Sequence, residues 1–274
     1  MSVEIRELEL PEAIKGLHFL SSYAFTPTPP LPEFEKYAVR IRNRHGARYF
    51  GAFDKNQLQA ILCATTPLTQ NLRGKLFPMG GVSNVATHPA ARRKGYVRQL
   101  MSRLFNEFHA GHIATSCLYP FKETFYQRLG YVSLPQTKQI LFNPKCLSPI
   151  LNMDLEVSYE LVSFYDGYEC FRSFCQQIQQ TTHGMALFSI PQKEAAKSHE
   201  AWLLFAKKDQ NIVAAMNYTL KDQIMNQTMH AYVFLFKDAA GQFALLKWIA
   251  PVSYTHLRAH ETVLDLVCRL LLEK

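Results

Sequence analysis

The amino-acid sequence predicts an α/β fold built from two units that follow one another along the chain. Residues 82–108 contain a predicted strand, a cationic turn and an amphipathic helix in succession. The order strand, helix, three strands and helix is then expected in each half of the chain. With 274 residues, of which 48% are hydrophobic and 19% charged, the chain is long enough for two domains with sizeable cores.

The first half begins with a predicted strand over residues 3–10 and a predicted helix over residues 13–25. Prolines dominate residues 26–32, and this stretch is expected to be extended because each proline removes a donor and restricts the residue before it. A hairpin turn at residues 54–56 then joins two strands. These two strands and the next one are expected at residues 48–53, 58–66 and 80–87.

The strand that ends before Pro89 is followed by a turn with three consecutive cations and one glycine, Arg92-Arg93-Lys94-Gly95. A strand that passes into a helix through this turn directs free backbone N–H groups and the positive end of a helix dipole at one point. Gly95 lets the backbone approach a ligand closely, because it has no Cβ atom. The turn indicates a site for a pyrophosphate or another dense anion, although by itself it is better explained as a solvated basic turn.

Apolar residues recur at i, i+3 and i+4 from Val97 to Phe108 and predict the helix after this turn. The nearly all-apolar residues 113–118 predict a strand that is buried on both faces. A short helix that carries Tyr126 is then expected to end at Gly130, which suits a C-cap.

The second half shows the same order of elements. Its strands and helices are expected at residues 155–163 (strand), 168–178 (helix), 202–206, 212–218 and 231–236 (strands) and 243–249 (helix). The turn at residues 237–241 takes the place of the cationic turn, but it lacks the three cations and contains an aspartate that would face an anion. This unit is therefore not expected to hold a phosphate.

Two motifs, in this order, resemble the acetyl-CoA signature of the GNAT N-acetyltransferases. Residues 92–97, Arg-Arg-Lys-Gly-Tyr-Val, are similar to the family pattern Gln/Arg-x-x-Gly-x-Gly/Ala, from which Val97 departs. Residues 125–131, Phe-Tyr-Gln-Arg-Leu-Gly-Tyr, are similar to the family segment that ends in Tyr-x-x-(Phe/Leu)-Gly-Tyr. The bulky Val97, together with Thr87-His88-Pro89 and Arg98, resembles the Eis-like branch, in which a bulky aliphatic residue stands where other members carry glycine.

The resemblance implies tandem GNAT (acyl-CoA N-acyltransferase) folds with mixed sheets. It implies a catalytic GNAT domain at residues 1–145 and a degenerate, incomplete second GNAT-like domain at residues 155–251. Eis-like proteins continue into a sterol-carrier-like third domain, which is expected to be missing here. Residues 252–274 resemble a translated sequencing adapter, so that the natural protein is expected to be truncated near Ala250; a genuine amphipathic helix is the alternative.

The resemblance also implies acetyl-CoA-dependent N-acetyl transfer to a primary amine of an aminoglycoside, a polyamine or a lysine side chain. Acetyl-CoA would be the co-substrate, and the positions that match the family's binding segment are Val85, Ala86, Thr87, Arg92, Arg93, Lys94, Gly95, Tyr96, Val97 and Arg98. Tyr126 matches the family tyrosine that acts as general acid; packing of its ring on the pantetheine arm is the alternative. In Eis-like enzymes the general base is the C-terminal carboxylate of the third domain. The second candidate function is a non-catalytic acyl-CoA-binding sensor or scaffold.

The composition restricts the partners. The net charge of +8 suggests anionic ligands, but the basic residues are dispersed apart from residues 92–98 and no aromatic–basic interleaving accompanies them, which disfavours nucleic acid. No apolar run is long enough to span a bilayer and the N-terminus is no signal peptide, so a cytoplasmic protein without a membrane partner is expected.

The six cysteines lack metal-site spacing, and no metal is expected; Cys63 and Cys117 are expected in the core. The expected partner is a small-molecule or peptide amine, and an uncovered apolar face would favour a homo-oligomer.

Overall fold

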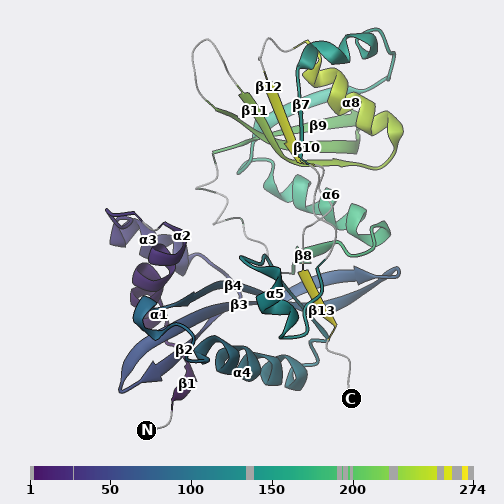
Figure 1. The fold of residues 1–274 in the computed structure, drawn as a ribbon. Helices are drawn as coiled ribbons and strands as arrows, with labels where there is room; N and C mark the ends of the chain where they lie inside the picture. Colours follow the sequence, from purple (N-terminus) through teal and green to yellow (C-terminus); the bar gives the residue numbers. More distant parts are fainter. Residues whose placement is uncertain are drawn as a thin grey trace. The chain divides into compact units, whose positions relative to one another are not determined.

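The computed structural model describes residues 3–26, 28–133, 139–189, 193, 197, 200–221, 228–251, 256–260 and 267–270. The chain divides into two compact units, each with its own sheet (Figure 1). Residues 1–134, 186–192 and 266–274 form the first unit, and residues 135–185 and 193–265 form the second. Within the described residues no helix is long and apolar enough to cross a membrane.

A mixed sheet forms the centre of the first unit. Its strands, in spatial order, are β1 (Glu4–Glu7), β2 (Ala47–Asp54), β3 (Gln57–Leu72), β4 (Lys75–Thr87), β5 (Thr115–Leu118) and β13 (Val267–Leu270), and β8 (Ala186–Phe188) also pairs with β3. β4 and β5 run parallel, whereas the other neighbours are antiparallel. The predicted α/β class with a mixed sheet is therefore confirmed.

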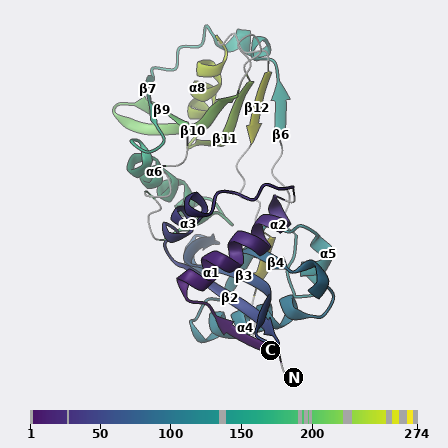
Figure 2. The same cartoon turned by 90° about the vertical axis from the view of Figure 1, so that its left-hand side faces the viewer.

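Helices cover both faces of this sheet (Figures 1 and 2). One face carries α1 (Leu10–Gly16), the π-helical turn η1 (Leu17–Ser21), α2 (Ser22–Phe25) and α3 (Phe34–Arg42), and the other carries α4 (Tyr96–Ala110). The buried cluster on the α4 side, here the α4-face core, includes Phe50, Leu62, Val82, Leu100, Leu104 and Tyr126. The cluster on the opposite side, here the α1-face core, includes Ile14, Leu17, Ile41, Ile61, Cys63 and Ala86. Cys63 and Cys117 are buried, as predicted.

The predicted helix after the cationic turn is confirmed as α4. Leu100, Met101, Leu104 and Phe108 are buried, in agreement with their helical spacing. Phe108 packs directly on the backbone of β4, because a Cβ atom built at Gly80 would lie 2.2 Å from its ring. This contact holds α4 against the strand that leads into its own first turn.

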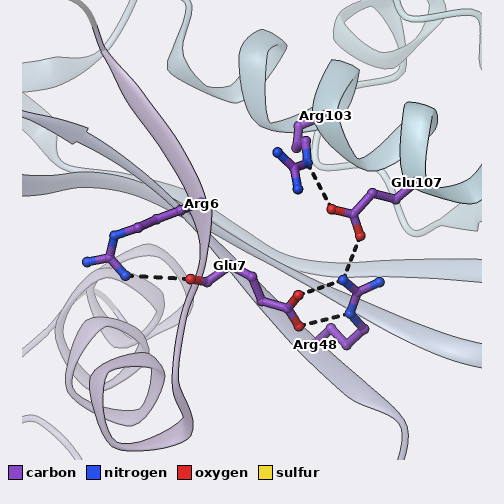
Figure 3. A network of polar contacts seen from close by, with 5 residues as sticks. All are labelled: Arg6, Glu7, Arg48, Arg103 and Glu107. Atoms are coloured by element: carbon purple, nitrogen blue, oxygen red, sulfur yellow. Dashed lines mark hydrogen bonds and ion pairs between the residues drawn. The ribbon is translucent and has the colours of Figure 1, made fainter.

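An ionic network joins α4 to the first two strands (Figure 3). Arg48 of β2 donates from Nε and Nη2 to the two carboxylate oxygens of Glu7, at 2.8 and 2.6 Å. The same Nη2 lies 2.6 Å from Oε2 of Glu107 on α4, and Glu107 also accepts from Nε of Arg103 at 2.8 Å. The hydrogen bonds from Arg48 hold the pKa of Glu7 below its ordinary value. The network therefore connects β1, β2 and α4 across the edge of the sheet.

The hairpin of β3 and β4 is longer than the sequence predicts. The strands expected at residues 58–66 and 80–87 are continued by further pairs as far as a turn at Arg73 and Gly74, both of which have positive φ. Pro67 marked the expected end of the first strand, but it lies at an irregularity of the ladder, where a proline is tolerated. Helix α3 also has no counterpart in the prediction, because its short apolar stripe is interrupted by charged residues.

The second unit contains a sheet with the order β6-β12-β11-β10-β9-β7. Its strands are β6 (Gln139–Phe142), β7 (Ser158–Ser163), β9 (Trp202–Lys208), β10 (Asn211–Lys221), β11 (Thr228–Phe236) and β12 (His256–His260), and its helices are η3 (Pro144–Ile150, 3₁₀), α6 (Tyr168–Thr181) and α8 (Ala239–Ile249). The predicted order strand, helix, three strands and helix is confirmed by β7, α6, β9 to β11 and α8. Strands β6 and β12 were not expected.

Two strands lie within residues 252–274, the segment predicted to be derived from an adapter. β12 pairs in parallel with β11, and β13 pairs antiparallel with β5. The backbone of this segment thus takes part in both sheets. The origin of the segment stays a prediction.

Candidate functional site

A cavity of about 660 Å³ lies in the first unit, where β4 ends and α4 begins. This volume is typical of small-molecule and cofactor sites. Nine of the ten residues predicted to bind acetyl-CoA line it, namely Val85, Ala86, Thr87, Arg92, Arg93, Gly95, Tyr96, Val97 and Arg98. Lys94, the tenth, is exposed and lies outside the lining.

One wall of the cavity is the end of β4, which continues beyond its parallel partner. The ladder with β5 runs from the pair Met79 and Thr115 to the pair Val82 and Leu118, whereas β4 itself extends to Thr87 and stays paired with β3. Within the described residues, the last part of β4 therefore has an edge that β5 does not cover. Backbone N–H and C=O groups on such an edge are free to pair with an extended ligand.

A second wall is the turn between β4 and α4, which contains two residues in the left-handed region. After a short 3₁₀ turn, Arg93 and Gly95 adopt φ values of +65° and +82°. Gly95 is the N-cap of α4, and no side chain of the described residues caps the first turn of this helix. A Cβ atom at Gly95 would meet nothing within 4 Å, so the glycine faces open space. Unpaired amides, the helix dipole and exposed guanidinium groups therefore converge on the cavity.

Tyr96 lines the cavity, and a hydrogen bond to β2 fixes its side chain. Its ring is buried, and its hydroxyl donates a hydrogen bond of 2.8 Å to Oδ2 of Asp54. This bond to a carboxylate raises the pKa of Tyr96. The structure thus brings Tyr96 to the predicted site, with its hydroxyl engaged by Asp54.

Tyr126, the predicted general acid, is 3% exposed and lies outside the cavity lining. Its ring centroid is 5.0 Å from that of Phe125 and 5.7 Å from that of Phe121, and both of these residues line the cavity. Burial raises the pKa of Tyr126 to about 12, so its hydroxyl is protonated throughout the neutral range. Tyr126 therefore lies next to the cavity wall as a potential hydrogen-bond donor.

The end of α5 (Glu123–Gln127) positions this tyrosine. The N–H of Gly130 donates to the carbonyl of Gln127 at 3.0 Å, and the N–H of Tyr131 donates to the carbonyl of Tyr126 at 3.2 Å. These two bonds, with Gly130 at a φ of +86°, form a Schellman motif and confirm the predicted C-cap. The hydroxyl groups of Tyr131 and Ser116 lie 2.8 Å apart and connect this helix end to β5.

The cavity also contains residues that the sequence analysis did not assign to it. They are Ala24, Phe25, Ala91, Phe121, Phe125, Arg128 and Leu129. Phe25 and Phe121 are 63% and 72% exposed, which is unusual for side chains of this size. Arg128 belongs to the second motif, two residues after Tyr126, and this position could have indicated that it lies near the cavity. Nothing in the local pattern around Phe25 indicates the site.

The corresponding turn of the second unit is closed by one of its own side chains. Oδ1 of Asp238 accepts a hydrogen bond of 2.8 Å from the N–H of Gly241 and caps α8. A Cβ atom at Gly241 would lie 2.8 Å from the carbonyl oxygen of Val213, so this glycine serves close packing. The first-unit turn leaves its amides uncapped, whereas the second-unit turn places a carboxylate on them that repels an anion.

Comparison with known proteins shows what the chain resembles. Residues 4–133 match the family model of the acetyltransferase (GNAT) domain. No curated protein matches the chain. Most of the first unit is therefore similar to the GNAT acetyltransferase domain, and the chain as a whole has a tandem GNAT fold.

Solved structures share this fold at low sequence identity. A protein of unknown function from Enterococcus faecalis V583, described as a probable N-acyltransferase, is 17% identical with a TM-score of 0.78, over 95% of this chain and 65% of that chain. Eis1 from Mycobacterium abscessus is 14% identical with a TM-score of 0.77, over 98% of this chain and 74% of that chain. A tandem GNAT protein from the clavulanic acid biosynthesis pathway is 12% identical with a TM-score of 0.54, over 96% and 91% of the two chains. The chain spans about two thirds of the length of the Enterococcus faecalis protein and of two GCN5-related N-acetyltransferases, from Anabaena variabilis and Kribbella flavida.

Proposed function

We propose that the protein is an acetyl-CoA-dependent N-acetyltransferase that acts on a primary amine of an aminoglycoside, a polyamine or a lysine side chain. One observation carries this proposal: an uncapped helix N-terminus and an uncovered strand edge meet at a single cavity. The cavity belongs to the region that matches the GNAT acetyltransferase domain. Because acetyl-CoA is an intracellular metabolite, the proposal includes a cytoplasmic location.

The turn before α4 provides what the pyrophosphate of acetyl-CoA requires. The free N–H groups of the first helical turn can each donate a hydrogen bond to a phosphate oxygen. Arg92, Arg93 and Arg98 line the same space, and hydrogen bonds from guanidinium groups to phosphate are stronger than neutral ones. Arg128 adds a further cation from the end of α5.

The uncovered edge of β4 suits the pantetheine arm, which is extended and contains amide groups. In this proposal the backbone of Val85, Ala86 and Thr87 pairs with the arm as a neighbouring strand would. One of these N–H groups then stabilises the charge that develops on the thioester oxygen. Phe121 and Phe125 supply an apolar wall of the same cavity.

Acetyl transfer forms a C–N bond and breaks the C–S bond of the thioester, and the departing sulfur must receive a proton. Tyr126 is the proposed donor. With a pKa of about 12 against about 8.5 for a thiol, complete proton transfer from the tyrosine is unfavourable by roughly 5 kcal/mol. A hydrogen bond from Tyr126 to the developing thiolate, which stabilises the charge without complete transfer, is therefore the role we assign to it.

The attacking amine must lose a proton, and the cavity offers no evident base. None of the described residues that line it is a carboxylate or a histidine. We therefore assign no general base among the lining residues.

Incubation of the full chain with acetyl-CoA and a panel of the three amine classes tests the proposal. Mass spectrometry is expected to show an acetylated amine together with one CoA released per product. Saturable acetyl-CoA binding without product for any amine would support the acyl-CoA-binding sensor or scaffold instead. No binding of acetyl-CoA in calorimetry would contradict both functions.

A further inference from the structure

A group of polar side chains gathers on the face of the first sheet that α1 covers, beside the strand end that lines the cavity. Tyr49 of β2, Cys63 of β3 and Ser83 of β4 lie side by side, because Tyr49 pairs with Cys63 and Cys63 pairs with Ser83. Residues that pair directly point to the same face of a sheet. Tyr49 and Cys63 belong to the α1-face core, so all three side chains lie on that face.

Arg44, just beyond the end of α3, reaches into this group. Its Nη1 donates a hydrogen bond of 2.9 Å to Oδ1 of Asn84 in β4. Asn84, whose φ is +52°, donates in turn from Nδ2 to Oγ of Ser21 at 2.8 Å. Burial raises the pKa of the Tyr49 hydroxyl and that of the Cys63 thiol, and in both cases the guanidinium of Arg44 opposes the rise. The positive charge of Arg44 therefore acts on the whole group.

The group has donors to spare for a ligand. Arg44 is half-buried, and among the described residues no carboxylate pairs with it. Tyr49 is 3% exposed, and its hydroxyl makes no hydrogen bond of ordinary geometry with the part of the chain that the structure describes. Ser83 is exposed, so the group is open to solvent on one side. A guanidinium and a hydroxyl with donors to spare suit a carboxylate, which accepts hydrogen bonds from both.

The geometry of acetyl transfer brings the acceptor amine to this face. An arm that pairs along the edge of β4 has its carbonyl groups near the plane of the sheet. An amine attacks a carbonyl carbon from above or below the plane of that carbonyl, so it arrives from one face of the sheet. The α4-face core, which includes Tyr126, fills one side. The cavity extends to the other side, because Ala86 of the α1-face core and Phe25 of α2 line it. The amine is therefore expected from the side on which Arg44 lies.

We infer that Arg44 binds a carboxylate of the acceptor, so that the substrate is a small molecule with both a primary amine and a carboxylate. This inference rests on the proposed function and narrows its acceptor class. Val85 directly follows Asn84, so the guanidinium lies within about 10 Å of the strand edge proposed for the thioester. This distance suits an amine and a carboxylate separated by several methylene groups, as in a straight-chain ω-amino acid.

The reaction is the one already proposed. The amine nitrogen of the amino acid forms the C–N bond, the C–S bond of the thioester breaks, the amine loses a proton and the sulfur gains one. The products are an N-acetyl amino acid and CoA. Arg44 keeps its proton and its charge throughout, because it holds the distant carboxylate and not the reacting atoms.

Three amines of similar chain length isolate the carboxylate. 6-Aminohexanoate carries a carboxylate, 1-aminohexane ends in a methyl group in its place, and 1,6-diaminohexane ends in a second amine. The full chain is incubated with acetyl-CoA and each amine, and mass spectrometry of the product gives kcat and KM. Calorimetry of each amine with the chain saturated with CoA measures binding without turnover.

Variants of the cation test the residue. Arg44→Gln removes the charge, whereas Arg44→Lys keeps it but lacks the planar fork of donors that fits a carboxylate. Arg40→Gln is the matched control, because Arg40 is an exposed cation of α3 and its loss changes the net charge equally. Tyr49→Phe removes the buried hydroxyl alone. Turnover of 1-aminohexane by each variant reports whether it is folded.

In the wild type, 6-aminohexanoate is expected to have the lowest KM of the three amines and to bind the CoA complex most tightly. Arg44→Gln should raise this KM by about 10- to 100-fold, the range for lost hydrogen bonds to a charged group, with Arg44→Lys and Tyr49→Phe between it and the wild type. The KM for 1-aminohexane should stay within about twofold in these variants, because this amine does not reach Arg44. Arg40→Gln should change neither value.

Two results overturn the inference and leave the proposed function intact. One is a wild type that shows no preference for 6-aminohexanoate, and the other is an Arg44→Gln variant in which KM rises equally for 6-aminohexanoate and 1-aminohexane, or for neither. A chain that binds acetyl-CoA but acetylates none of the amines contradicts the proposed function. In that case calorimetry decides the inference, which fails if Arg44→Gln binds 6-aminohexanoate as tightly as the wild type does.

Discussion

The hydroxyl of Tyr96 donates a hydrogen bond of 2.8 Å to Oδ2 of Asp54. The bond joins the first residue of α4 to the last residue of β2. Because no described side chain caps α4, the N–H groups of its first turn stay free for a ligand. The Tyr96–Asp54 bond fixes the orientation of this first turn relative to β2. This bond therefore holds the first residue of α4, which lines the cavity, to the end of β2.

Tyr96→Phe is therefore expected to weaken acetyl-CoA binding severalfold, since the ring stays packed while the bond that orients α4 is lost. Tyr159→Phe is the matched control, because the Tyr159 hydroxyl donates to the Ala244 carbonyl at 2.9 Å within the second unit. Calorimetry should show reduced affinity for the first variant alone. Equal losses in both variants would mean that general destabilisation, and not orientation of α4, causes the effect.

Gly95→Ala is expected to lower acetyl-CoA affinity by about tenfold or more, which corresponds to at least ~1.4 kcal/mol. The added Cβ would occupy the space through which a phosphate approaches, and the left-handed backbone at +82° strains an alanine by about 1–2 kcal/mol.

Gly74→Ala provides a closely matched control for this variant. Gly74 has a φ of +83° and open space around its Cβ position, but it lies in the turn between β3 and β4. Both variants should lose similar stability in urea unfolding, whereas only Gly95→Ala should lose affinity. An equal affinity for the two variants would show that no ligand approaches Gly95.

The cations of the turn are expected to contribute unequally. Arg93 lines the cavity and Lys94 does not, so Arg93→Ala should weaken acetyl-CoA binding more than Lys94→Ala. Binding should also weaken as salt rises from about 0.05 to 0.5 M, because the ionic contacts are screened. Calorimetry across this range measures both effects. Equal losses would indicate long-range charge alone, and affinity that does not respond to salt would contradict the pyrophosphate site.

Most of the cavity is predictable because one contiguous segment builds it. Residues 85–98 form a strand end, a turn and a helix start, and local rules of propensity and capping apply to each part. Phe25 is different, since it belongs to α2, far from this segment along the chain, and lines the cavity only as a result of the tertiary fold. The positive φ of Asn84 likewise follows from its register with β3, and no local pattern specifies a register between distant strands. The long hairpin was missed for the same reason, because an irregular ladder accommodates Pro67.

Arg48→Met is expected to lower the free energy of unfolding by about 1 kcal/mol at pH 7, a modest effect because Arg48 and Glu7 are each more than a third exposed and solvent screens the pair. The pKa of Glu7 is lower in the folded chain than in the unfolded one. Its contribution is therefore fully present above its ordinary pKa and is lost as the pH falls through the folded value.

Urea unfolding between about pH 7 and pH 3 measures this dependence. The stability of the wild type should fall more steeply with decreasing pH than that of Glu7→Gln, which has no carboxylate to protonate. Parallel curves for the two proteins would show that the bond to Arg48 contributes nothing to folding.

Tyr126→Phe is expected to reduce amine-dependent turnover by roughly 10²-fold, the lower range for loss of a general acid, with little change in acetyl-CoA affinity. The ring contacts with Phe121 and Phe125 persist in phenylalanine, so the change isolates the hydroxyl. Because burial raises the pKa of Tyr126 to about 12, the hydroxyl stays protonated over the usual assay range.

The pH profile follows from this value. Turnover should rise with pH as the amine loses its proton, and Tyr126 should produce no descending limb below about pH 10, its ordinary pKa. Tyr126→Phe should keep the ascending limb at a lower height. The stability that depends on the buried neutral hydroxyl is present below about pH 10 and is lost as the pH rises toward 12. The raised pKa would be contradicted if the wild type showed a descending limb near neutral pH and Tyr126→Phe abolished it. Unchanged turnover in Tyr126→Phe would show that Tyr126 takes no part in the chemistry and is a packing residue beside the cavity.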